Sequence, residues 1–131
     1  MRFLRHDIKN ERGQTMTEFA MVLPLLVVLL FGVIQFGIAF NNYISLTDAV
    51  RAASRKAVVS RESGNPVGAC LTAAQNAAGD LKQSQLTVTC SSTWQPGADV
   101  VVTGTYPYSI KLLGWVVKSG NLKTRIQERV E

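Results

Sequence analysis

Apolar residues are concentrated in one long run close to the N-terminus. The run extends from Phe19 to Phe40, contains no ionisable residue, and is interrupted only by Pro24, Gly32, Gln35 and Gly37. An α-helix rises about 1.5 Å per residue, so roughly 20 apolar residues are enough to cross a bilayer. The pattern therefore predicts a transmembrane helix within residues 14–40.

Beyond the apolar run the pattern changes, but no proline or glycine occurs between Gly37 and Gly64 to end the helix. Apolar residues now recur at spacings of three, four and seven, which is typical of one face of a helix. These residues are Phe40, Tyr43, Ile44, Val50, Ala53, Ala57 and Val58. We predict one continuous helix from about Gln14 to Ser60, with an apolar first half and an amphipathic second half. A small α+β domain that simply begins with a helix is the alternative for the second half.

The rest of the chain predicts a short helix and several strands. A turn is expected at residues 62–68, where two glycines and an Asn-Pro pair occur, and a helix from Cys70 to Lys82. Alternation of apolar and polar residues predicts strands at 85–91, Val100–Tyr106 and Leu122–Val130, the last with a basic outer face. Residues 110–117 are compatible with a helix or a loop. The predicted fold is α+β, with a small antiparallel sheet of about three strands packed on the amphipathic half of the long helix.

Charge predicts how the helix is oriented in the membrane. Four basic residues precede the apolar run, whereas the first one after it is Arg51. An excess of Lys and Arg before a span favours a cytoplasmic N-terminus and an exported C-terminal domain. The net charge is +5, but the remaining bases are scattered and no aromatic residues alternate with them. This pattern argues against a nucleic-acid partner.

The two cysteines, Cys70 and Cys90, both lie in the part predicted to leave the cytoplasm. In an oxidising compartment such a pair indicates one disulfide; two buried free thiols are the alternative. Two separate cysteines and the single histidine, His6, do not make a metal site. We expect no metal and no cofactor.

Glu18 and Pro24 are unexpected residues in this setting. A carboxylate at the edge of a span is costly and usually has a partner or a function. If the chain were cut after Gly13, the new α-amino group of Gln14 would lie about one helical turn from Glu18, on the same or a neighbouring subunit, and could pair with it. Pro24 cannot donate a hydrogen bond to the carbonyl of Ala20, so a kink is expected there, with or without a mechanical role.

These residues carry a resemblance to a known family. The pattern of Gly13, four residues, then Glu18-Phe19 before an apolar helix resembles the prepilin processing site of type IV pilin-like proteins. More narrowly, residues 11–37 are similar to the N-terminal region of TadE-like proteins, which are minor pilins or pseudopilins of tight-adherence (Flp-type) pili. The matching positions are Gly13, Glu18, Phe19, Ala20, Leu23, Pro24, Leu25, Gly32, Phe36 and Gly37. Gln35 departs from the family, which often has an acid there.

The resemblance implies a type IV pilin-like fold and a role in pilus assembly. A prepilin peptidase would cut between Gly13 and Gln14 on the cytoplasmic side, and Glu18 and Phe19 would serve subunit packing. The implied domains are a basic leader (1–13), a transmembrane helix (14–40) and a periplasmic domain (41–131). Implied partners are the inner membrane, other pilin-like subunits and the pilus assembly machinery. The chain is longer than a major pilin of this type, which favours a minor subunit.

Three other interpretations of the sequence are a secreted protein, an uncleaved membrane anchor and an enzyme. A secretory signal peptide cleaved near residues 37–39 is not favoured, because the apolar run of this chain is much longer than the apolar region of a signal peptide. An uncleaved, signal-anchored periplasmic binding or assembly protein is the main alternative, and it would keep its first residues. An enzyme is not expected, because the sequence has no recognisable nucleophile–base pair, metal-ligand cluster or phosphate-binding glycine loop.

Overall fold

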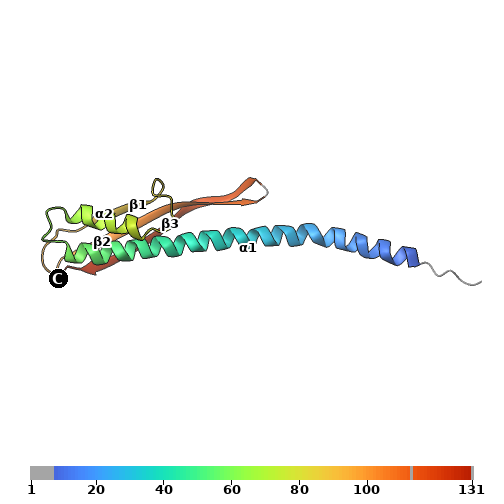
Figure 1. The fold of residues 1–131 in the computed structure, drawn as a ribbon, viewed down its shortest axis with the longest axis horizontal. Coiled ribbons are helices and arrows are strands. Elements are labelled where there is room, and N and C mark those ends of the chain that lie inside the picture. Colours follow the sequence, from blue (N-terminus) through green and yellow to red (C-terminus); the bar gives the residue numbers. More distant parts are fainter. Residues whose placement is uncertain (1–7, 113, 131) are drawn as a thin grey trace, which may run out of the picture.

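The structure, a computed structural model, describes residues 8–112 and 114–130. Its elements are, in order, α1 (Ile8–Val59), α2 (Pro66–Ala77), β1 (Thr87–Ser91), β2 (Asp99–Leu112) and β3 (Trp115–Arg129). In Figure 1 the N-terminal half of α1 extends alone, while its C-terminal half lies against the other elements. The predicted α+β fold, with a long N-terminal helix and a three-stranded antiparallel sheet, is confirmed.

α1 begins earlier than predicted. It starts at Ile8 instead of about Gln14, so Gly13 lies inside the helix, and it ends at Val59. The early start has a local reason, because Lys9, Glu11 and Arg12 are good helix formers and one glycine costs a helix only about 1 kcal/mol relative to alanine. Residues 1–7 of the predicted leader, including His6, lie outside the described residues.

The C-terminal half of α1 buries one face against α2 and the sheet. The prediction of a buried stripe is right for Val50, Ala53 and Ala57, which are fully buried. It is wrong for Phe40 and Tyr43, which are 56% and 41% exposed, and for Ile44. Phe40 and Tyr43 line a groove between α1 and the sheet. Ile44 lies on a side of α1 that faces solvent. The buried face also includes residues that the prediction omitted, namely Leu46, Ala49 and Ser54.

α2 begins before the predicted Cys70 and ends before Lys82. Asn65 caps its N-terminus, since its Oδ1 accepts a hydrogen bond of 2.8 Å from the backbone N–H of Gly68. Pro66 follows at the first helical position, where a missing N–H has no cost. The Asn-Pro pair that predicted a turn is therefore the start of the helix. At the other end, Gly79 adopts a φ of 57° and the helix does not continue.

The sheet has the order β1-β2-β3, and both neighbouring pairs are antiparallel. β2 runs through Pro107, where the predicted strand ended. β1 pairs only with residues 101–105 of β2, so the part of β2 around Pro107 has an open edge. Proline is tolerated at sheet edges. Residues 110–112 end β2 and residues 115–117 begin β3, so this part of the chain is the end of the β2–β3 hairpin instead of the helix or loop that was expected; Gly114 has a φ of 89°.

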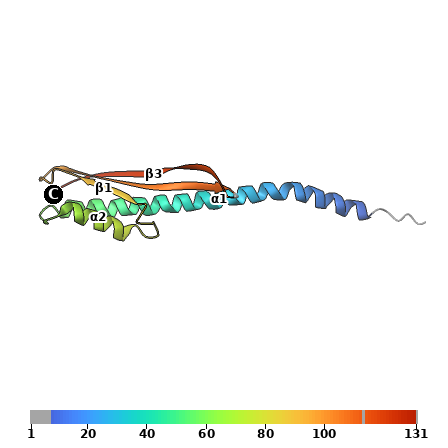
Figure 2. The ribbon, with the colours of Figure 1, turned by 90° about the horizontal axis from the view of Figure 1, so that it is seen from above.

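The core lies between the sheet and the two helices, which share one side of it in Figure 2. One cluster of buried residues is centred on Val50, Ala53, Ala57, Cys70, Ala74, Val100, Val102 and Val130. A second contains Leu46, Ala49, Ala78, Leu81 and Tyr106. The alternation predicted for the third strand is confirmed, with Leu122, Thr124 and Ile126 turned inward and the basic residues between them exposed.

Candidate functional site

The N-terminal half of α1 presents an apolar surface that the other described residues leave largely uncovered. In its most apolar window of 18 residues the mean hydropathy is 2.6 and none of the window is buried. By length and composition α1 could cross a membrane. The large exposed side chains are Met16, Phe19, Met21, Val22, Leu23, Leu25, Leu26, Val28, Leu29, Leu30, Phe31, Val33, Ile34, Phe36, Ile38 and Phe40. All predicted processing and packing residues lie at or within the start of this surface.

Gly13 has no packing role in the fold. A Cβ built at Gly13 meets no heavy atom within 4 Å, and its backbone is part of α1. Its carbonyl accepts a hydrogen bond of 2.9 Å from Thr17 Oγ1, which any residue could do. Since glycine is less favourable in a helix than alanine by about 1 kcal/mol, folding alone does not explain a glycine here.

Gln14 and Glu18 lie one helical turn apart on the same side of α1. Gln14 Nε2 donates a hydrogen bond of 3.2 Å to Glu18 Oε1. Both residues are exposed, and so is Phe19, at 60%. Among the side chains that the structure describes, no Lys or Arg forms an ion pair with Glu18; the ion pairs there are Asp48–Arg51 and Arg61–Glu62. The carboxylate is thus available at the surface, one turn after the predicted cleavage point.

Pro24 lies inside α1, which continues on both sides of it. In Figures 1 and 2 the blue part of α1, which includes residue 24, bends relative to the rest of the helix. Proline removes one backbone hydrogen bond and crowds the preceding turn, so it is a usual cause of such a bend. The bend lies in the part of α1 that is free of the C-terminal domain.

Comparison with protein families identifies this part of the chain. Residues 13–55 match the family model described as TadE-like protein. This segment is similar to TadE-like proteins. The match begins at Gly13 and covers 43 of the 131 residues, so it contains the exposed apolar half of α1 and most of its buried face. The similarity predicted for residues 11–37 is confirmed and extends further along α1. Neither curated proteins nor solved structures gave a match to the chain.

The matched segment reaches from the exposed apolar part of α1 into the folded domain. Its second part contributes Leu46, Ala49 and Val50 to the core, which means that the matched helix also organises the folded domain. The sheet and α2 lie outside the match. The segment therefore combines two structural features in one helix. Its first part is an exposed apolar surface, and its second part packs in the core of the domain.

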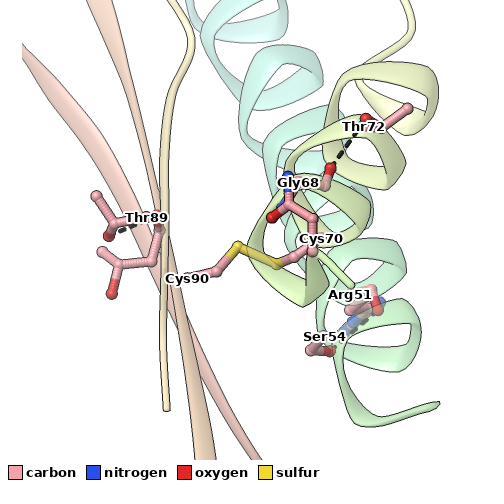
Figure 3. Close-up of a disulfide and its surroundings, with 9 residues drawn as sticks. Arg51, Ser54, Gly68, Cys70, Thr72, Thr89 and Cys90 are labelled. Carbon is pink, nitrogen blue, oxygen red and sulfur yellow. Dashed lines mark hydrogen bonds between the residues drawn. A yellow bond between two sulfur atoms is a disulfide. The ribbon is translucent and has the colours of Figure 1, made fainter. Parts of the chain in front are cut away.

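The predicted disulfide is confirmed. Cys70 of α2 and Cys90 of β1 are bonded, with their Cα atoms 6.6 Å apart, as Figure 3 shows. Cys70 is fully buried in the larger core cluster. The bond fixes α2 to β1, the short edge strand of the sheet. It lies far along the chain from Gly13 and Glu18 and supports the domain, not the apolar surface.

A groove between α1 and the β2–β3 hairpin was not predicted from the sequence. Its volume is about 350 Å³. It is lined by Phe36, Ala39, Phe40, Tyr43, Tyr108, Ile110, Lys118 and Leu122. The rings of Phe36 and Phe40 stack on one side, with centroids 6.5 Å apart. The sequence signal for the strand side of the groove is the alternation of Tyr108, Ile110 and Leu112 with polar residues. This signal was missed because the strand was expected to end before Pro107.

In the part of the chain that the structure describes, no group of three or more His, Cys, Asp and Glu side chains is placed to hold a metal ion. The isolated acids Asp80 and Asp99 are exposed, and Asp99 accepts a hydrogen bond from Gln127. The expectation of a non-catalytic protein stays a prediction.

Proposed function

We propose that the protein is a minor pilin-like subunit for assembly of a tight-adherence type IV pilus and has no catalytic activity of its own. The observation that carries this proposal is the coincidence of two features: the TadE-like match begins at Gly13, and it contains an apolar helix surface that the rest of the described structure leaves uncovered. An apolar surface of this extent requires lipid or other apolar helices around it. A subunit that passes from a membrane into a bundle of helices meets both.

A prepilin peptidase would cut this chain between Gly13 and Gln14, on the cytoplasmic side of the membrane. The sequence pattern supports the position, and so does the absence of a packing reason for glycine at residue 13. The cut would leave Gln14 with a free α-amino group, which is largely protonated at neutral pH. This new charge would lie one turn from Glu18.

The amino group of Gln14 and the carboxylate of Glu18 would then form a charge pair, within one subunit or between neighbouring subunits. Each charge alone is costly in an apolar environment, and the pair reduces that cost. A subunit would therefore dock in the register in which its charge is neutralised. The exposed Phe19 beside Glu18 would contribute apolar contact at the same level.

The proposed location is the inner membrane, with the folded domain in the periplasm. The disulfide supports an oxidising compartment for the domain. The partners in this proposal are the prepilin peptidase, other pilin-like subunits and the inner-membrane assembly machinery.

The substitution Glu18→Ala tests the packing role. We expect the variant to insert into the membrane as before but to lose co-purification with other pilin-like subunits, because its neighbours lose the charge that neutralises the N-terminal amine. Asp80→Ala removes an equally exposed acid from the loop after α2 and is the matched control. Co-purification of Glu18→Ala at the level of Asp80→Ala would rule out the charge-pairing role.

One observation favours the alternative of an uncleaved anchor. α1 passes through Gly13 without a break, so the chain around the predicted cut is helical before processing. An anchored periplasmic binding or assembly protein would keep this helix intact together with the residues before it. The mass of the protein in its membrane distinguishes the two functions.

A further inference from the structure

We propose that the β3 side of the end of the β2–β3 hairpin, residues 114–117, inserts into the interfacial layer of the same membrane that α1 crosses. We call these residues the hairpin tip. The protein would then contact the bilayer at two places, through α1 and through the hairpin tip. This goes beyond the proposed pilus function, since it requires that α1 lies in a bilayer but not that Gly13 is a processing site.

The hairpin tip lies at the level of the apolar part of α1. Tyr108, Ile110 and Lys118 share a groove with Phe36 and Phe40, which belong to the last turns of the apolar run. From there the hairpin continues along α1 in the direction of its N-terminus, beyond the end of β1 and α2, as both Figure 1 and Figure 2 show. If α1 crosses a membrane, the hairpin tip is therefore carried to the membrane boundary.

The side chains of the hairpin tip are apolar and exposed. Trp115, Val116 and Val117 are 81%, 58% and 65% exposed, and they follow one another in the sequence. Further along β3, exposed and half-buried residues alternate, as expected for a sheet with one face packed on helices. At the start of β3 this alternation is absent, since residues 115–121 are all exposed, and a register shift between Ile110 and Lys111 makes Val117 an extra residue in β3. The tip thus presents a continuous apolar surface.

The residues around the tip are those that favour a membrane interface. Trp and Tyr are enriched at the boundary between lipid and water, and Trp115 and Tyr108 are present here. Lys111 and Lys118 flank the tip, and long basic side chains reach from an apolar surface to headgroups. The set combines apolar insertion with basic groups that suit the phosphates of the headgroup layer.

The backbone limits how deeply the hairpin can enter. β1 pairs with β2 only at residues 101–105, and β3 is an edge strand, so both edges of the hairpin tip carry unpaired backbone groups within the described sheet. Such groups cannot lie in hydrocarbon without partners. Insertion is therefore confined to the side chains of the tip, at the depth of the headgroups and the first carbons of the acyl chains. The headgroup layer would then lie at the level of the tip, and the hydrocarbon layer would surround the part of α1 that lies N-terminal to that level.

A protein partner explains the hairpin tip less well than lipid does. A helix of a second copy would fill the groove, but Trp115, Val116 and Val117 are not among the groove's lining residues. They would stay exposed after the groove was filled. A headgroup layer at the level of the tip would cover them directly.

Tryptophan fluorescence of the full-length protein, with one chain in each lipid nanodisc, tests the inference. The variant Trp94→Phe leaves Trp115 as the single tryptophan. We expect its emission to shift to the blue, to be protected from aqueous acrylamide, and to be quenched more by lipids brominated near the headgroup than by lipids brominated at the chain ends. The matched control is Trp115→Phe, which keeps Trp94, a residue packed on the core of the domain, and should not respond to brominated lipid.

Failure of this inference can be told from failure of the membrane span. The variant Met21→Trp in a background of Trp94→Phe and Trp115→Phe reports on the exposed apolar part of α1 further from the domain, and we expect quenching by lipids brominated at the chain ends. If this control behaves as expected while Trp115 is open to acrylamide and insensitive to brominated lipid, the inference is overturned and the pilus function is unaffected. Protection of Trp115 only when two chains share a nanodisc would also overturn it, in favour of a second copy. If Trp94→Phe fails to fold, the difference between wild type and Trp115→Phe gives the same signal.

Discussion

Gly104 of β2 faces α1 at a point where the two elements are in direct contact. A Cβ at this position would overlap Val50 Cγ2 and lie 3.0 Å from Leu46 Cδ1. Both contacts are with fully buried side chains of α1, which have little freedom to move. The glycine therefore permits the sheet to approach the helix, and the small residues Ala49 and Ala53 on α1 serve the same purpose.

The substitution Gly104→Ala should destabilise the folded domain. Overpacking of a well-filled core typically costs about 1–3 kcal/mol, and we expect the free energy of unfolding to fall by that amount. Urea unfolding of the full-length protein in detergent, followed by near-ultraviolet circular dichroism, measures the change. Gly64→Ala is the matched control, because a Cβ there meets no heavy atom within 4 Å. Equal stability of the two variants would show that α1 and β2 are not packed as described.

Single residues were predictable where their chemistry is local. Gly13, Glu18 and Pro24 stand out in the sequence because each is unusual in or beside an apolar helix. The residues of the buried face of α1 were harder to predict. The spacing of apolar residues shows that one face of the helix is buried, but it does not fix exactly which residues around the helix axis belong to that face. Leu46 and Ala49 were missed because only the position of the sheet decides which side of α1 is covered.

At the scale of elements, helices were easier to predict than strands. α1 follows from a long apolar run and a helical period with no interruption, both of which are local signals. β2 continues through Pro107, and β3 begins just after Gly114, residues that usually end a strand. The pairing of β2 with β3 keeps both strands together there, and this pairing joins residues far apart in the chain.

The disulfide between α2 and β1 should contribute to the stability of the domain. β1 has only five residues and pairs with one neighbour, so the bond to Cys70 is a main restraint on its position. A loop of about 20 residues is worth roughly 3 kcal/mol in the chain-entropy model. We expect the double variant Cys70→Ser, Cys90→Ser to lose about that free energy of unfolding in the same urea assay.

The matched control for the cysteine variant is Thr72→Ala with Thr89→Ala, which changes exposed residues on the same two elements. Their hydroxyls bond only to nearby backbone carbonyls of Gly68 and Thr103, so we expect a small effect. A double cysteine variant as stable as this control would contradict the role given to the disulfide.

At the scale of the whole molecule, α1 divides the protein into two parts with different surroundings. Its N-terminal half has an uncovered apolar surface, and its C-terminal half is part of a domain with a core of its own. The sequence predicts this division, because the change from an all-round apolar helix to an amphipathic one is local. It does not predict the groove or the hairpin tip, which exist only because a long hairpin folds back beside α1.

The intact mass of the protein extracted from its native membrane is the most direct test of processing after Gly13. We expect the wild type and Gly32→Ala to begin at Gln14, and Gly13→Ala to retain the preceding residues. A Cβ at either glycine meets no heavy atom within 4 Å, so both variants should keep α1 folded and differ only at the cleavage site. A wild-type protein that associates normally with its pilin-like partners but still carries residues 1–13 would contradict the proposed processing and the charge pair that depends on it.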